Sequence, residues 1–128
     1  MSYDHTLTAG ALVDIIKAAT DDTPAVFAQP PRTFNPPAVI VRMPESVEPA
    51  AVGMTVDRAM VPLLCAVGAD QMPELMGLLG QVRKAVLAQR SLGGIAQATW
   101  PASYRNFALI TVAGADYLSA EVLLEIHA

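Results

Sequence analysis

Residues 55–89 read TVDRAMVPLLCAVGADQMPELMGLLGQVRKAVLAQ, an apolar strand pattern followed directly by a helical one. From 55 to 67 alternate residues form two rows that are both largely apolar, which predicts a long strand covered on both faces. We expect a helix on one face and a neighbouring subunit on the other. The second row supplies the candidate subunit interface, which consists of Met60, Pro62 and Leu64. Because proline cannot donate to a ladder, Pro62 favours an edge position or a bulge.

The second half of this stretch predicts a helix over about 71–89. Asp70 suits the N-cap, since its carboxylate accepts a bond from an otherwise unpaired amide. Gly93-Gly94 follows the helix and predicts its termination. The apolar stripe recurs at helical spacing and consists of Met72, Leu75, Met76, Leu79, Val82 and Val86. A long strand next to such a helix favours an α+β fold.

Further elements are expected on both sides of this stretch. They are a helix at 7–19 that begins with Thr8 as its N-cap, a short strand at 26–28, and strands at 38–42, 95–100, 104–112 and 117–127. Two proline-containing segments, 20–37 and 44–53, are predicted loops. Apart from the short strand, the order is α-β-β-α-β-β-β. We therefore predict a single α+β domain over 1–128, with a mostly antiparallel sheet of about five strands and two helices packed on it.

The closing strand alternates clearly between two faces. Leu118, Ala120 and Val122 begin an apolar row that belongs against a helix. Glu121 and Glu125 lie in the other row, which is expected to meet water or a partner. Gly114-Ala115-Asp116 predicts the turn before this strand, so the last two strands form an antiparallel hairpin.

The composition favours a protein that assembles with other subunits. Hydrophobic residues make up 53% of the 128 residues and charged residues only 16%, whereas charged residues usually reach about a quarter. A domain of this size buries only about two-thirds of its unfolded surface, so apolar surface is left over. Exposed apolar surface of this kind usually marks an interface.

Charge and hydropathy exclude several classes of function. The formal net charge is −4, and no basic cluster is present that would neutralise a row of phosphates, so gripping nucleic acid is not expected. No apolar run approaches the ~20 residues needed to span a bilayer. The start Met1-Ser2-Tyr3-Asp4-His5 does not resemble a secretory leader. The single cysteine, Cys65, excludes an intramolecular disulfide and fits a reducing compartment.

The sequence gives no pattern for catalysis or for cofactor binding. It contains no glycine-rich phosphate loop. Cys65 has only His5 and His127 as possible bases, both near the ends, and its apolar neighbours favour a buried core residue. The acidic residues mark no buried pair for acid–base chemistry. We therefore predict neither an enzyme nor a cofactor.

Two polar groupings have ordinary structural explanations. Glu121, Glu125 and His127 share a strand face, but alternate residues lie about 7 Å apart, which is too far to hold one ion unaided. Trp100, Tyr104 and Arg105 are more consistent with a strand packed on a loop, because nucleic-acid binding needs several positive charges. No metal site is predicted.

The order of elements resembles the tail terminator proteins of long-tailed bacteriophages, of the type found in phages of actinobacteria. The resemblance covers the chain from about residue 7 to the end and depends on order, length and loop placement. The segments that carry it are Ala11–Ile16, Pro37–Val41, the long strand, Leu75–Arg83 with Leu92-Gly93-Gly94, and Val112–Leu118.

The resemblance implies a non-enzymatic virion protein at the neck of the tail, made in the host cytoplasm. Such proteins form a ring, usually a hexamer, on the last ring of tail-tube subunits, where they end tube growth and meet the head–tail connector. DNA only passes through, and no membrane is involved. In this setting the two loops offer Phe27, Phe34, Glu45 and Glu48 as candidate partner residues, and Glu121 and Glu125 as a candidate lumen face.

Two alternatives remain open from the sequence. A head–tail joining or tail-tube protein of a phage would have a similar composition. A small-ligand-binding or enzymatic α+β domain is also compatible, because the six methionines and Trp100 are able to line an apolar cavity.

Overall fold

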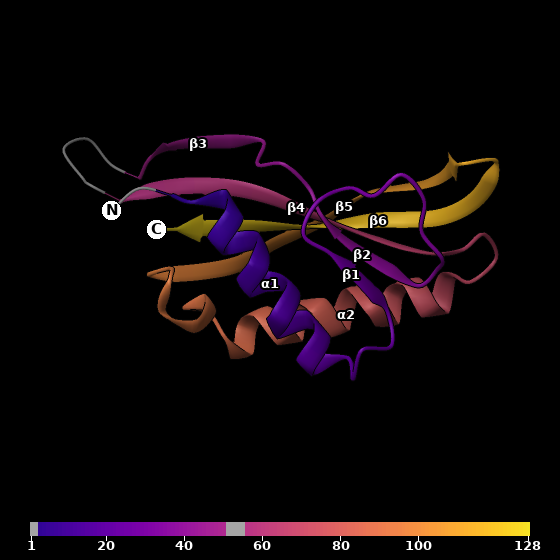
Figure 1. Ribbon diagram of the computed structural model, residues 1–128, viewed down its shortest axis with the longest axis horizontal. Helices are drawn as coiled ribbons and strands as arrows, with labels where there is room; N and C mark the ends of the chain where they lie inside the picture. The colour runs from indigo at the N-terminus through magenta and orange to yellow at the C-terminus, as the bar shows by residue number, and fades with distance from the viewer. Residues whose placement is uncertain (1–2, 51–55) are drawn as a thin grey trace.

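The computed structural model, which describes residues 3–50 and 56–128, is an α+β fold in which two helices cover one face of a six-stranded sheet (Figure 1). The elements follow the order α-β-β-β-β-α-β-β. Their bounds are α1 His5–Ala19, β1 Ala25–Phe27, β2 Ala38–Val41, β3 Ser46–Pro49, β4 Asp57–Gly68, α2 Met72–Ala88, β5 Ala98–Val112 and β6 Ala115–His127, with a 3₁₀ turn, η1, at Leu92–Gly94. The α+β class, the two helices and the mostly antiparallel sheet agree with the prediction.

The two long strands β4 and β6 form the middle of the sheet. The strand order is β1-β2-β4-β6-β5, and β3 pairs with β4 beside the end of β2. Only the β1–β2 pair is parallel. The β4–β6 register runs without a shift from Arg58 opposite His127 to Gly68 opposite Tyr117. The apolar strand identified from the sequence is therefore an interior strand.

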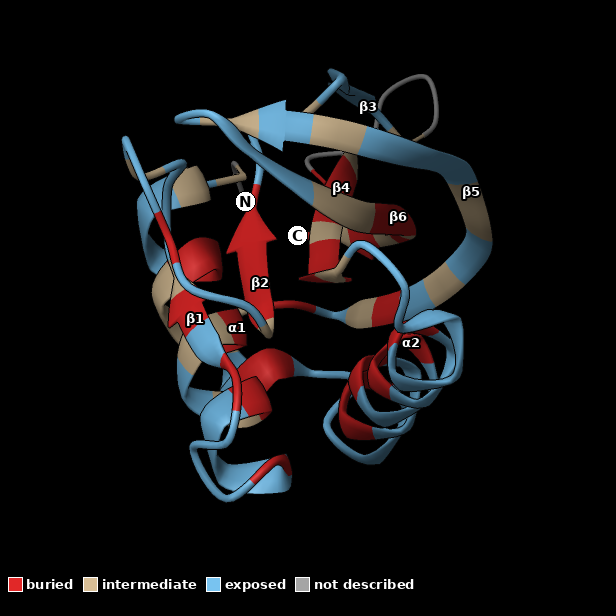
Figure 2. Ribbon diagram, turned by 90° about the vertical axis from the view of Figure 1, so that its right-hand side faces the viewer, coloured by how far each residue is buried: buried red, intermediate tan, exposed pale blue. Residues whose placement is uncertain are grey.

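The main core lies between the sheet and the helices. α1 packs against β1 and β2, whereas α2 packs against β4, β5 and β6. Figure 2 shows the buried residues concentrated between these layers. The largest fully buried side chains in this core are Leu12 and Ile16 of α1, Val39 and Val41 of β2, Val61, Leu63 and Val67 of β4, Leu75 and Leu79 of α2, Leu92 of η1, and Leu124 and Ile126 of β6.

The number and limits of the strands differ from the prediction. The expected strands at 95–100 and 104–112 are one strand, β5, whose register shifts at Pro101/Ser103 and Arg105/Ala108 bend it without ending it. β3 lies inside the segment that was predicted as a loop at 44–53. The end of that loop and the predicted strand start at Thr55 lie outside the described residues.

The predicted N-caps of both helices and part of the predicted buried face of α2 are also wrong. Asp4, not Thr8, is the N-cap of α1, and its Oδ1 accepts the Leu7 N–H over 3.1 Å. α2 begins after Gln71 with no side-chain cap, so Asp70 does not have the predicted role. Met72 and Met76 are each 45% exposed. The buried face of α2 instead includes Leu78 and Ala85 along with Leu75, Leu79, Val82 and Val86.

Candidate functional site

The face of the sheet opposite the helices, here called the outer face, carries most of the residues singled out from the sequence. Strand alternation places Met60, Pro62 and Leu64 of β4 on it. In the β4–β6 register, Leu64 lies opposite Glu121 and Met60 lies opposite Glu125. The candidate subunit interface and the candidate lumen residues are therefore neighbours on one surface.

One end of the outer face is covered by the chain itself. Phe34, Ala38, Ile40 and Ala66 form a second buried cluster, against which Phe27, Leu64, Val112 and Tyr117 pack. The Phe34 ring lies 4.9 Å from the Tyr117 ring, and the Tyr117 hydroxyl donates to the Phe34 carbonyl over 3.2 Å. Phe34 is only 9% exposed. Phe34 is thus a packing residue of this chain and Phe27 is partly buried beside it, while their predicted contact with a partner remains a prediction.

Pro62 lies where β4 changes its neighbour. The Arg42 N–H donates to the Pro62 carbonyl over 3.0 Å, and proline has no N–H with which to return the bond. The next bond to β4 comes from the Glu45 N–H, which donates to the Met60 carbonyl over 2.8 Å. Although β4 is an interior strand, its proline therefore lies at a local gap between β2 and β3. Pro62 is buried, whereas Met60 and Leu64 are half-buried.

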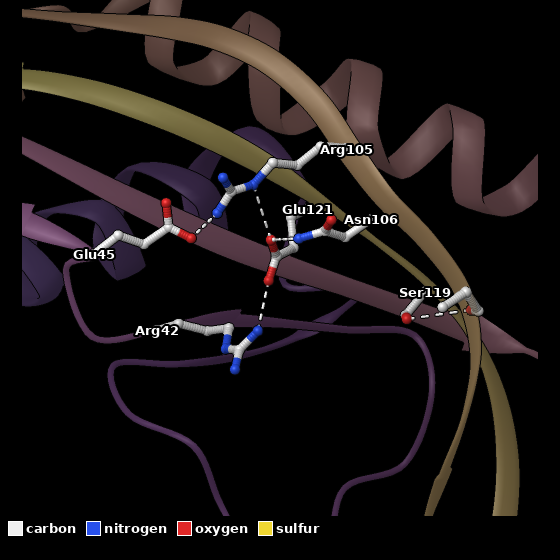
Figure 3. A network of polar contacts seen from close by, with 7 residues as sticks. Arg42, Glu45, Arg105, Asn106, Ser119 and Glu121 are labelled. Carbon is white, nitrogen blue, oxygen red and sulfur yellow. Dashed lines mark hydrogen bonds and ion pairs between the residues drawn. The ribbon is translucent and has the colours of Figure 1, made fainter.

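Glu121 lies at the centre of a polar network on the outer face (Figure 3). Its Oε2 accepts from Arg42 Nη1 over 2.6 Å, and its Oε1 accepts from Arg105 Nε over 3.1 Å and from Asn106 Nδ2 over 2.7 Å. Arg105 also pairs with Glu45. Glu121 is 2% exposed. Glu121, predicted as part of a lumen face, is therefore covered and neutralised within its own chain.

The network lowers the pKa of Glu121. Burial on its own raises the pKa of this carboxyl, but the hydrogen bonds from Asn106 and Arg42 and the charges of Arg42 and Arg105 outweigh it. The ionised form is therefore favoured in the folded chain. Glu121 contributes stability that is present above its ordinary pKa and lost as the pH falls through the lowered value.

The opposite end of the outer face is less covered. Glu125 Oε2 lies 2.9 Å from His127 Nε2, and the Trp100 ring packs edge-on against His127 with centroids 4.8 Å apart. The Arg90 guanidinium lies 4.9 Å from the centre of the Trp100 ring. Glu125 remains partly exposed, so it is the member of the predicted lumen pair that still offers a carboxylate to a partner.

The other two acidic candidates are on the surface. Glu45 and Glu48 are exposed, and they pair with Arg105 and Arg58 respectively. Glu48 belongs to β3, which holds it in a fixed register opposite Arg58 of β4. The segment containing both residues is therefore more ordered than the predicted loop, although it remains accessible.

Two of the surface grooves include several apolar side chains in their lining. The larger, with a volume of about 510 Å³, lies between α1 and α2 and is lined by residues that include Ala11, Ile15, Ala18, Ala85 and Ala88. The smaller, of about 320 Å³, lies on the outer face between the segment at Pro30 and Pro31 and the end of β5 at Ile110 and Val112. Neither groove is lined by Trp100, and neither contains the arrangement of a nucleophile with a base.

Cys65 lies in the main core, where burial raises the pKa of its thiol to about 12. Within residues 3–50 and 56–128, no three His, Cys, Asp or Glu side chains are placed to hold a metal ion. In the same part of the chain, no helix is long and apolar enough to cross a membrane.

Sequence reasoning missed the partners of Glu121. Arg42 was treated only as the end of a strand, and Arg105 as the neighbour of an aromatic residue. The signal that was available is Asn106, because asparagine is enriched at positive φ and here has a φ of 56°. Such a residue inside an apolar strand indicates a bulge that turns a polar side chain toward the sheet.

No family model matches this chain, and a comparison with curated proteins finds no relative.

Proposed function

We propose that this chain is a structural protein of a long-tailed phage virion, which caps the tail tube as a ring of identical subunits. In this role it ends tail growth and joins the tube to the head–tail connector, and DNA only passes through the ring. Its partners are further copies of itself, the tail-tube protein and the connector. The proposal follows from the resemblance in the order of elements, with which the α+β fold is compatible.

The observation that carries an assembly function is the placement of the exposed apolar side chains. The main core is filled, yet α2 exposes Met72, Met76 and Leu87, and the β2–β3 region exposes Met43 and Val47. These two surfaces belong to different elements and consist of different side chains. A ring requires two such different patches on each subunit, because its contacts are head-to-tail.

The acidic character of the chain is compatible with a passage for DNA. Like charges do not attract the phosphate backbone, so an acidic lining lets DNA slide. Glu125 is the residue that supports such a lining on the outer face, because Glu121 is neutralised within the chain.

The proposal is tested with purified protein and with tubes grown from the tail-tube protein of the same phage. We expect closed rings in electron micrographs and shorter tubes when the chain is added. Met76→Glu and Val47→Glu each place a charge on one of the two patches and should abolish both effects. Lys84→Glu is the matched control, since Lys84 is an exposed polar residue of α2 outside the proposed patches. Wild-type protein that leaves tube length unchanged would exclude the capping function.

The main competing function is that of a tail-tube or joining protein, which would use the same two patches. A tube subunit differs because its rings stack without a limit. Long filaments formed by the purified chain alone, in place of closed rings, would favour that function.

A further inference from the structure

The outer edge of β5 is an unprotected strand edge. β5 is the last strand of the sheet and pairs only with β6 among the described residues. Its first half is interrupted by Pro101 and by two register shifts. Arg90 Nε also donates to the Thr99 carbonyl there, over 3.2 Å. The stretch from Ala108 to Val112 has none of these interruptions.

The hairpin turn determines which backbone groups of this stretch point outward. Ala113 and Gly114 have φ of 50° and 81°, and Val112 lies opposite Ala115, as in a two-residue turn with two positive φ angles. Along the β5–β6 ladder, residue pairs that exchange backbone hydrogen bonds then alternate with pairs that do not. Val112 and Ile110 bond to β6, so the N–H and C=O groups of Leu109 and Thr111 face away from it.

The side chains of this edge are uncharged and, apart from Thr111, apolar. Residues 107–112 read Phe-Ala-Leu-Ile-Thr-Val. Leu109 is 61% exposed and Phe107 is 48% exposed. Free edges in soluble proteins are usually protected by lysine, proline or a bulge, because they otherwise pair with another strand. This half of β5 has no such protection.

The other free edges of the described sheet are too short to pair with the whole stretch from Ala108 to Val112. β1 contains three residues, and β3 contains four and ends at Pro49, which cannot donate. A second copy of β5 does match, because two uncharged strands pair without repulsion and each supplies the same outward groups. The contact is therefore isologous, with the same surface used by both copies.

We propose that two copies of this chain pair through β5 in antiparallel orientation, with Leu109 of each opposite Thr111 of the other and Ile110 on the two-fold axis. In this register the outward N–H and C=O of Leu109 in each copy bond to those of Thr111 in the other copy, which gives four hydrogen bonds. No other register uses the outward groups of both residues in this way. If Leu109 lay opposite Leu109 of the other copy, the paired region would extend into the bulge between Arg105 and Ala108. If Thr111 lay opposite Thr111, the paired region would extend into the turn at Ala113 and Gly114. The two sheets become one, and the two Ile110 side chains meet on the outer face beside the 320 Å³ groove that Ile110 and Val112 line.

This dimer does not depend on the proposed ring function, because the ring patches lie on α2 and beside β3. The dimer is tested by a cross-link at Ile110 and by variants of β5, whereas capping is tested by tube length and by variants at Met76 and Val47, so either proposal is able to fail without the other.

Disulfide cross-linking tests the register directly. Residues opposite each other in a pair without mutual hydrogen bonds have Cβ atoms about 4.5–5.5 Å apart, close to the separation that a disulfide needs. Ile110→Cys should therefore form covalent dimers under mild oxidation. Leu7→Cys is the control, since Leu7 is exposed on α1 and lies far from β5 in the sequence. The native Cys65 is buried and stays unreactive.

Sedimentation of two further variants tests the contact without a cross-link. Thr111→Pro removes two of the four hydrogen bonds per dimer, so the dissociation constant should rise roughly tenfold or more. Leu109→Lys keeps the backbone and places a charge at the edge, with the same expected direction. Urea unfolding verifies that both variants are folded. A monomeric wild type, or equal cross-linking of Ile110→Cys and Leu7→Cys, would overturn the proposal.

Discussion

Arg42 Nη1 donates to Glu121 Oε2 over 2.6 Å, although the two residues are 79 positions apart in the chain. Arg42 follows β2 and Glu121 lies in the middle of β6, so the ion pair spans β4 on the outer face. The carboxylate is buried and Arg42 is half-exposed. The ion pair therefore holds the start of the β2–β3 connection against the centre of the sheet. Arg105 and Asn106 tie the β5 bulge to the same carboxylate.

Removing this carboxylate should destabilise the fold. Glu121→Ala leaves Arg42, Arg105 and Asn106 without their common acceptor, and we expect a loss of roughly 2–4 kcal/mol in the free energy of unfolding. Urea denaturation measures the loss. Glu48→Ala is the comparison, because its ion pair with Arg58 is exposed and contributes little. If the two variants have the same unfolding midpoint, the Glu121 network is not a stabilising element.

The stability that Glu121 supplies should depend on pH in one direction only. Its pKa is lowered from the ordinary 4.5 in the folded chain, so the contribution is complete above that value and is lost as the pH falls through the lowered pKa. Glu121→Gln cannot ionise. The difference in unfolding free energy between wild type and Glu121→Gln should therefore shrink in acid. A difference that stays constant from neutral pH to pH values well below 4.5 would contradict the assigned pKa direction.

Two neighbouring positions of α2 should differ sharply in their tolerance of alanine. Leu79 is fully buried, so Leu79→Ala should cost about 2–5 kcal/mol through lost contacts and a cavity. Met76 is 45% exposed, and Met76→Ala should change the stability of the monomer by no more than about 0.5 kcal/mol. Thermal unfolding of dilute protein measures both. Similar losses at the two sites would place Met76 in the core, as the sequence pattern had predicted.

Cys65 should report on global unfolding. Its thiol is buried and has a pKa of about 12, so a thiol reagent at pH 8 should not label the native protein within minutes. In denaturant the same reagent should label one thiol per chain at the rate of a free cysteine. Rapid labelling without denaturant would show that the middle of β4 opens locally.

The β5–β6 turn should accept a stabilising substitution. Ala113 has a φ of 50°, which alanine adopts only at a cost, whereas asparagine followed by glycine is the preferred pair for this turn. Ala113→Asn should raise the free energy of unfolding by about 0.5–1 kcal/mol. Ala115→Asn, at a strand position without positive φ, should give no gain. A loss of stability at position 113 would contradict the assigned turn.

The sequence predicted those elements whose hydrophobic pattern is strong and local. β4 and α2 are where their periodicity placed them, and the alternation of β6 is correct along its whole helix-facing row. β5 was divided at 101–103, where Pro101 and Ser103 resemble a turn, whereas pairing with β6 holds both parts in one strand. Cross-strand pairing of this kind depends on distant residues and leaves no local signal.

The candidate residues were harder to place for the same reason. Glu121 and Glu125 have the same alternation, so their sequence environment does not distinguish them. They differ because Glu121 accepts hydrogen bonds from Arg42 on one side and from Arg105 and Asn106 on the other, which distant parts of the chain supply. Phe34 was assigned to a partner because it lies in a long proline-rich segment, but that segment buries Phe34 against β2 and β4 of its own chain.

The position of β6 has a consequence for how the protein is made. β6 is the last strand in chain order, yet it lies between β4 and β5 and supplies hydrogen bonds to both. While the chain is being synthesised, β4 has no long neighbour on that side until residues 115–127 have left the ribosome. The sheet therefore cannot close beside β4 until β6 has emerged, although α2 and the Phe34 segment, which cover the two faces of β4, are made earlier. Until then the backbone edge of β4 is open to pairing with other strands, which is the condition that makes folding intermediates prone to aggregate.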